Sequence, residues 1–136
     1  MLKKLINPPG TEKIYEKWQF SQAVQVGETV WVSGQVGMEK NRLAEGIEAQ
    51  TRLAFENLRR VLAAAGATLA DVVELVSYHK HMAEMAGFSR VKAEFFPADY
   101  PAWTAVGVTE FASPGVLVEI RATAVVGSGA GSGIVT

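Results

Sequence analysis

The chain has 136 residues, a formal net charge of -1 and no cysteine. This length fits one domain with a single hydrophobic core. Hydrophobic residues make up 49% and charged residues 20%, as in an ordinary globular protein. The near-zero charge argues against nucleic acid or an anionic membrane as a partner, and the missing cysteine excludes thiol catalysis and disulfides. We expect a cytoplasmic protein, because no stretch has the pattern of a signal peptide or a membrane span.

Residues 1–126 are predicted to form one domain, and residues 127–136 a flexible Gly/Ser-rich tail. The first clear strand follows Gly27. Its alternation predicts two faces, one with Val30, Val32 and Val36, the other with Trp31, Ser33 and Gln35. Gly34 interrupts this strand, which indicates a bulge or a close backbone approach.

The clearest helix is predicted over residues 45–65. Apolar side chains recur there at helical spacing and form one buried stripe, Ile47, Ala54, Leu58, Val61, Leu62 and Ala65. Glu56 and Arg60, four residues apart, are expected to pair on the exposed side. Gly66 is expected to end the helix.

The rest of the domain alternates strands with a second helix. Strands are predicted over residues 72–81, 103–108 and 116–126, and a helix over residues 84–96 stops at Pro97. The buried stripe of this helix is Phe88, Val91, Phe95 and Phe96. The element order predicts an α+β fold in which a mixed sheet carries both helices on one face.

The last strand alternates most regularly. Its apolar face, suited to close packing of a helix, comprises Val116, Val118, Ile120, Ala122, Ala124 and Val126. No third helix is left to cover the second face of the sheet, which is expected to hold Trp31, Val73, Leu75, Leu117 and Val125. A monomer rarely exposes so much apolar area, so a partner subunit is expected there, through twofold or threefold closure.

The same uncovered face is expected to hold polar groups beside the apolar area. They are Ser33, Gln35, Trp103 and Glu119. Polar groups beside apolar area at a boundary between subunits predict a ligand pocket.

Four segments resemble the four motifs of the YjgF/RidA family, in the right order. They are FSQAV at residues 20–24, VSGQVG at 32–37, PAWTAVGV at 101–108 and VEIRATAVV at 118–126. The segment AAAGATLADVV at residues 63–73 also resembles the first helix of the family and the turn after it. The resemblance implies a chorismate-mutase-like fold and a homotrimer with three clefts between subunits. It also implies chemistry, since many members hydrolyse reactive enamines and imines, and the family is often described as endoribonuclease L-PSP.

The chain departs from this family at three site positions. Trp103 stands where the P-A-R motif has an arginine, which in deaminase members grips the substrate carboxylate through two charge-assisted hydrogen bonds. Phe20 replaces the usual tyrosine, and Ala105 replaces a frequent cysteine. The indole of Trp103 has one N–H donor and no charge, so it cannot form that clamp.

Other site positions match the family. Glu119 matches the glutamate that is thought to position the attacking water, and Ser33 and Gly34 lie in the motif that lines the pocket. Arg121, two residues from Glu119, is the first candidate for a cation that would hold a carboxylate. The resemblance thus implies Glu119 as the catalytic residue and backbone amides near Ala105 as groups that polarise the substrate.

These residues predict a deaminase-like hydrolase for a reactive imine, enamine or related small metabolite in an inter-subunit cleft. Because the site becomes more apolar, a flat, neutral or cationic ligand is expected rather than a standard 2-imino acid. No metal or organic cofactor is expected. The alternative is a non-catalytic small-molecule-binding or protective trimer, which the substitutions at Phe20, Trp103 and Ala105 favour. An endoribonuclease ranks last, because there is no basic patch.

The two histidines form an H-x-H pattern in a predicted strand. His79 and His81 would then point to one face, as two ligands of a zinc site do. No third histidine exists to complete such a site. We expect histidines at the surface or at a subunit boundary, not metal ligands.

Overall fold

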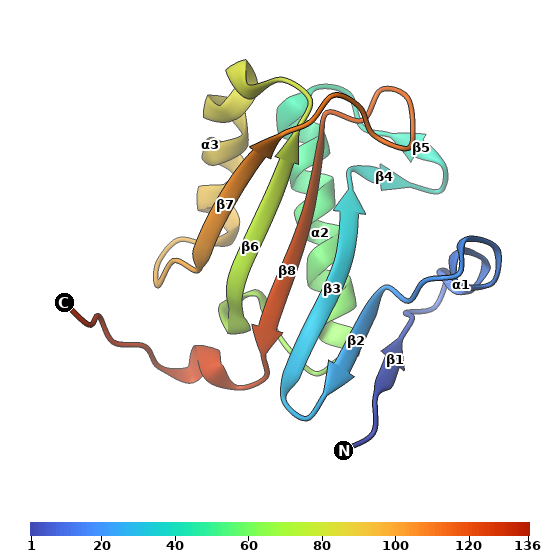
Figure 1. The fold of residues 1–136 in the computed structure, drawn as a ribbon. Coiled ribbons are helices and arrows are strands. Elements are labelled where there is room, and N and C mark those ends of the chain that lie inside the picture. Colours follow the sequence, from blue (N-terminus) through green and yellow to red (C-terminus); the bar gives the residue numbers. More distant parts are fainter.

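The computed structural model describes residues 1–136 and shows the predicted α+β fold (Figure 1). Its six-stranded sheet has the order β1-β2-β3-β8-β6-β7. Only β6 and β7 pair in parallel, so the sheet is mixed. The helices α2 (Ile47–Ala64) and α3 (Met85–Phe95) lie on the same side of the sheet, as the sequence predicts.

The predicted elements are all present, and several short ones join them. The sheet strands are β1 (Lys4–Ile6), β2 (Ala23–Val26), β3 (Thr29–Val36), β6 (Val72–His79), β7 (Ala102–Gly107) and β8 (Val118–Val125). The sequence did not predict β1, α1 (Glu12–Trp18), β2 or the small hairpin of β4 (Met38–Glu39) and β5 (Arg42–Leu43). Three 3-10 turns complete the chain, η1 (Leu69–Asp71), η2 (Met82–Glu84) and η3 (Ser128–Ala130). No helix is long and apolar enough to cross a membrane.

The core lies between the sheet and the two helices. From β8, the alternate residues Val118, Ile120, Ala122 and Ala124 are buried, as predicted. The ring of Phe55 on α2 contacts three phenylalanine rings, two on α3 and one just after it. Its centroid is 5.9 Å from that of Phe88, 5.1 Å from that of Phe95 and 5.6 Å from that of Phe96. This aromatic cluster fixes α3 against α2, because each ring removes a large apolar area from water.

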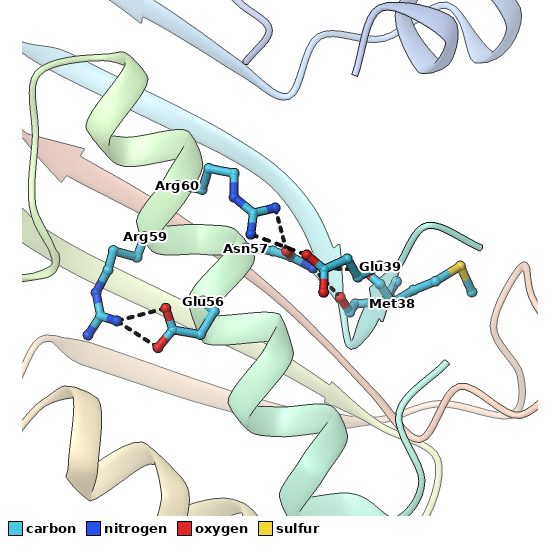
Figure 2. A network of polar contacts seen from close by, with 7 residues as sticks. Met38, Glu39, Glu56, Asn57, Arg59 and Arg60 are labelled. Carbon is cyan, nitrogen blue, oxygen red and sulfur yellow. Dashed lines mark hydrogen bonds and ion pairs between the residues drawn. The ribbon is translucent and has the colours of Figure 1, made fainter. Parts of the chain in front are cut away.

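The exposed side of α2 carries ion pairs that differ from the predicted one (Figure 2). Glu56 does not pair with Arg60. It accepts two hydrogen bonds from Arg59, three residues on, with the shorter at 2.6 Å. The guanidinium of Arg60 turns instead to Glu39 on β4, 3.7 Å away.

Asn57 ties the end of β3 to α2. Its side-chain amide donates to the carbonyls of Val36 and Met38, both at 3.0 Å (Figure 2). Gly66 has a φ of 79°, the left-handed conformation that favours glycine after a helix, so it ends α2 as predicted.

A β-bulge in β3 changes which side chains face the core. The register shifts between Val32 and Gln35, so that Ser33 and Gly34 together lie opposite Arg121 on β8. Gln35 therefore turns toward the helices and is 7% exposed. The prediction that placed Gln35 on the uncovered face and Val36 on the core face was wrong, because a bulge adds one residue to the period of two.

A second register shift lies in β6, between Val72 and Glu74. It leaves Val73 42% exposed and turns Leu75, with no exposed surface, toward the core. The prediction of Leu75 on the uncovered face was wrong for the same reason. Trp31, 47% exposed, does lie on that face, as expected.

The side chain of Asp71 connects the C-terminal turn η3 to the turn η1. Its carboxylate accepts hydrogen bonds from the backbone N–H of Thr68 at 3.0 Å and of Gly129 at 2.8 Å. Burial alone would raise the pKa of Asp71, but hydrogen bonds from Gly129, Thr68 and Gly127 outweigh it and lower the pKa. The predicted tail thus begins with a turn held to η1, and residues 131–136 have no secondary structure.

We expect Asp71→Ala to lower the free energy of unfolding by about 1–3 kcal/mol at pH 7, because buried N–H groups lose their acceptor. Urea unfolding followed by circular dichroism measures this loss. Asp99→Asn is the control, since Asp99 is exposed and has a φ of 52° that asparagine tolerates. Because the folded pKa of Asp71 lies below its ordinary value of 3.8, the loss should shrink as the pH falls from 3.8 through the folded pKa. A loss that persists unchanged at low pH contradicts the role of the carboxylate.

Candidate functional site

The carboxylate of Glu119 lies against the bulge in β3. Glu119 is on the outward face of β8 and half-buried. A Cβ atom on Gly34 would lie only 2.5 Å from Oε2 of Glu119. The sequence predicted either a bulge or a close approach at Gly34, and both occur there. A side chain at position 34 would push the Glu119 carboxylate out of its present position.

The Glu119 carboxylate has no hydrogen-bond donor or ion-pair partner among the described contacts. Its cross-strand neighbours are Val36 on β3 and Tyr78 on β6. Burial raises the pKa of Glu119 above its ordinary value. A carboxylate with free oxygens and a raised pKa is a stronger proton acceptor than an ordinary glutamate.

Hydrogen bonds hold the Phe20 segment beside the bulge. The Ser33 hydroxyl donates to the carbonyl of Ser21 at 2.7 Å, and the Ser33 N–H donates to the carbonyl of Gln22 at 2.8 Å. The buried Gln35 amide adds a bond to the Gln22 side chain at 3.0 Å. Phe20 is next to Ser21 and 42% exposed, at the start of the segment that these bonds hold beside the bulge.

Arg121 also lies on the outward face of β8, two residues from Glu119. Its Nε donates to the Tyr78 hydroxyl at 3.1 Å, and that hydrogen bond is the main cause that raises the pKa of Arg121. No ion pair joins Arg121 to Glu119. The guanidinium is therefore directed to Tyr78 and does not neutralise the Glu119 carboxylate.

Trp103 and Ala105 lie on the opposite face of the sheet from Glu119. They pair with Leu75 and Ser77 of β6, whose side chains face the helices. The indole of Trp103 stacks on Phe88 of α3, with centroids 5.9 Å apart. The expectation that one face holds both Trp103 and Glu119 was wrong, because the pairing with β6 sets the direction of each side chain on β7.

A buried chain of hydrogen bonds fixes the Trp103 ring. Its indole N–H donates to the Ser77 hydroxyl at 2.9 Å, and the Ser77 oxygen is 2.7 Å from Nε2 of His79. If the hydroxyl donates to Nε2, the His79 proton is on Nδ1, which has no partner. His79 is 1% exposed, and burial lowers its pKa, which favours a neutral ring.

The predicted surface position of His79 was therefore wrong, while His81 is exposed just before η2. A core histidine with a hydroxyl partner needs no metal to explain it. No group of three or more His, Asp or Glu side chains is placed to hold a metal ion.

The sequence analysis missed one cation near Trp103. Nζ of Lys92 on α3 lies 4.4 Å from the centroid of the Trp103 ring. Burial lowers the pKa of Lys92. The signal was present, because Lys92 follows Phe88 by four residues and so shares the buried side of its helix.

Comparisons with known proteins agree on one family. The profile of the family described as endoribonuclease L-PSP matches residues 11–126. The RutC family protein YjgH of Escherichia coli is 41% identical over 105 residues, 75% of this chain and 80% of that protein. A protein of Dermatophagoides farinae named 2-iminobutanoate/2-iminopropanoate deaminase is 39% identical over 94 residues, 67% of this chain and 73% of that protein.

A solved structure shows the same fold. A Mycobacterium tuberculosis member of the YjgF/YER057c/UK114 family superposes with a TM-score of 0.82 at 34% identity, over 92% of this chain and 100% of that chain.

We expect Gly34→Ala to lower the free energy of unfolding by about 1–3 kcal/mol, because the added methyl group overlaps the Glu119 carboxylate. Glu119→Ala should remove most of that penalty in the double variant, since the overlapping atoms are then absent. A double-mutant cycle from urea unfolding measures this coupling. Gly133→Ala is the control, because nothing lies within 4 Å of its added Cβ. Penalties that simply add would show that the two residues do not touch.

Proposed function

Because the chain belongs to the endoribonuclease L-PSP family, also called YjgF/RidA, we propose that it is a deaminase-like hydrolase of a small metabolite. The substrate is a reactive imine, an enamine or a related compound. The carrying observation is the half-buried Glu119 carboxylate, free of partners and held against the Gly34 bulge. One relative is named as an imine deaminase, which is consistent with this chemistry.

The proposed assembly is a homotrimer in which each cleft lies between one face of the sheet of one subunit and the other face of the sheet of its neighbour. Glu119 and Trp103 point to opposite faces, so one chain alone cannot place both in a single pocket. A neighbouring copy would bring its β7 edge, with Trp103 and Ala105, toward Glu119 of the first. The exposed apolar side chains of the uncovered face, Trp31 at 47% and Val106 at 38%, favour such a contact.

In the proposed reaction, Glu119 orients a water molecule toward the imine carbon and takes one of its protons. The water oxygen bonds to that carbon, and the electron pair of the C=N bond moves to nitrogen. That proton passes to nitrogen and gives a carbinolamine. Glu119 then moves the hydroxyl proton to the amino nitrogen, the C–N bond breaks, and the carbonyl product and ammonia are released. β7 is an edge strand, so its outer backbone N–H groups near Ala105 are available to polarise the substrate.

The substrate is proposed to differ from a small 2-imino acid. Trp103 has no charge, and its single N–H already donates to Ser77. Position 103 therefore offers no donor to a carboxylate. Losing a charge-assisted hydrogen bond costs about 1.5–3 kcal/mol, which disfavours a ligand held mainly by its carboxylate at this position.

A second candidate is a non-catalytic small-molecule-binding protein with the same assembly. The specific observation that favours it is the Trp103 ring, which is 38% exposed and is backed by the buried Phe88, since an ordered aromatic surface can bind a flat ligand without any turnover. The assay of Glu119 variants below separates the two candidates.

We expect ammonia release from an imine of a bulky or aromatic amino acid, generated in situ, to exceed release from 2-iminopropionate and 2-iminobutyrate. Glu119→Gln should reduce kcat by about 10²–10⁴-fold, as the loss of general base catalysis does. The wild-type rate should fall at acidic pH, because protonation of Glu119 at its raised pKa removes the base.

Trp103→Arg tests the substrate proposal in the same assay and should raise turnover of the two small 2-imino acids. Rapid turnover of 2-iminopropionate by the wild type contradicts the proposed preference. If no imine releases ammonia above the protein-free rate, the binding-protein candidate replaces the enzyme.

We expect the wild-type chain to sediment as a trimer and Trp31→Glu to shift it toward smaller species, because the variant buries a charge in the proposed interface. Analytical ultracentrifugation gives the mass directly. Ala93→Glu is the control, since it adds the same charge at an exposed position of α3. A monomeric wild type, or a trimer unaffected by Trp31→Glu, contradicts this interface.

A further inference from the structure

Lys92 is a half-buried cation without a counter-ion. Its Nζ lies 4.4 Å from the Trp103 ring centroid and 6.0 Å from that of Tyr100. The structure contains four ion pairs, and Lys92 belongs to none of them. The ammonium group of Lys92 donates no hydrogen bond within the chain either. Ring contacts offset part of the lost hydration, but three N–H donors remain available for a ligand.

The surface under Lys92 is rigid. The Trp103 ring is fixed by its bond to Ser77 at 2.9 Å and by stacking on Phe88. Lys92 follows Phe88 by four residues on α3, so both side chains lie on the side of the helix that contacts the indole. The indole beneath the ammonium is therefore ordered before any ligand arrives, which lowers the ordering cost of binding.

A cavity of about 460 Å³ reaches this region through Tyr100, although neither Lys92 nor Trp103 lines it. Tyr100, whose ring faces Lys92, is also part of the cavity wall. The wall is mostly apolar and includes Val73, Phe95, Phe96 and Pro97. Asp99 is the one acidic residue in this wall, and it is exposed. The arrangement suits a ligand with an apolar body in the cavity and an anionic end at Lys92.

We propose that Lys92, with Trp103 and Tyr100, binds the carboxylate of a flat aromatic or conjugated monoanion whose body occupies the adjoining cavity. We assign this monoanion as the substrate class of the proposed hydrolase, so the inference rests on the proposed function. It replaces the expected neutral or cationic ligand with an anionic one. The positive charge comes from α3, since Trp103 on β7 supplies none.

Isothermal titration calorimetry with benzoate tests the site without any turnover, and benzamide serves as the neutral ligand of the same shape. Benzoate should bind the wild type about tenfold or more tightly than benzamide, because a charge-assisted bond is lost in the amide. Lys92→Gln should weaken benzoate binding about tenfold or more and leave benzamide unchanged. Lys92→Arg should retain binding, and added salt should weaken it.

Lys17→Gln is the matched control, because Lys17 lies 5.6 Å from the Trp18 ring centroid in an exposed pair. It should bind benzoate as the wild type does. Lys92→Met keeps the apolar stem over the indole and repeats the test if Lys92→Gln fails to fold. Equal binding of benzoate and benzamide, no saturable benzoate binding, or unchanged benzoate affinity in Lys92→Gln and Lys92→Met overturns the proposal.

The two proposals fail in different assays. Benzoate binding that depends on Lys92, without ammonia release from any imine, retains the anion site and removes the hydrolase. Ammonia release with the same KM in wild type and Lys92→Gln retains the hydrolase and overturns the anion site.

Discussion

The strict alternation of β8 determines where the candidate site lies. This strand is hydrogen-bonded on both edges, to β3 and to β6, so its side chains cannot rotate away from their faces. Val118 and Ile120 have no exposed surface, and their burial against the helices stabilises the fold through the apolar area removed from water. Glu119, between them, is therefore forced onto the uncovered face. The position of the carboxylate is a consequence of core packing on either side of it.

Two bulges then adjust what surrounds this strand. In β3, the extra residue at Ser33–Gly34 leaves room for the Glu119 carboxylate and turns Gln35 inward, where it bonds to Gln22. In β6, the shift near Val73 places Leu75 in the core. Through the pairing of Leu75 with Trp103, that shift also decides the face of the indole. Short irregularities thus set the chemistry of both faces.

The sequence predicted the elements whose apolar residues repeat at regular spacing. It missed the side-chain positions that depend on pairing between strands or on packing between elements. Both long helices and the strand β8 have repeating apolar positions, so their existence and faces could be inferred. The helix α1 contains no buried residue, and β1 has only three residues, so neither leaves such a pattern. Glu119 and Gly34 were found through motifs and glycine geometry. The face of Trp103 depends on a neighbouring strand, and the contact with Lys92 depends on where α3 packs.

The attachment of the C-terminal turn to Asp71 also affects how the protein can be handled. Ser128, Gly129 and Ser132 form part of the cavity wall beside Tyr100, so the chain leaves the domain at the edge of that cavity. The two ends of the chain lie at opposite edges of the sheet (Figure 1). An affinity tag fused after Thr136 would extend from the cavity side, whereas a tag before Met1 would extend from the side of β1. Ligand measurements are therefore cleaner with an N-terminal tag.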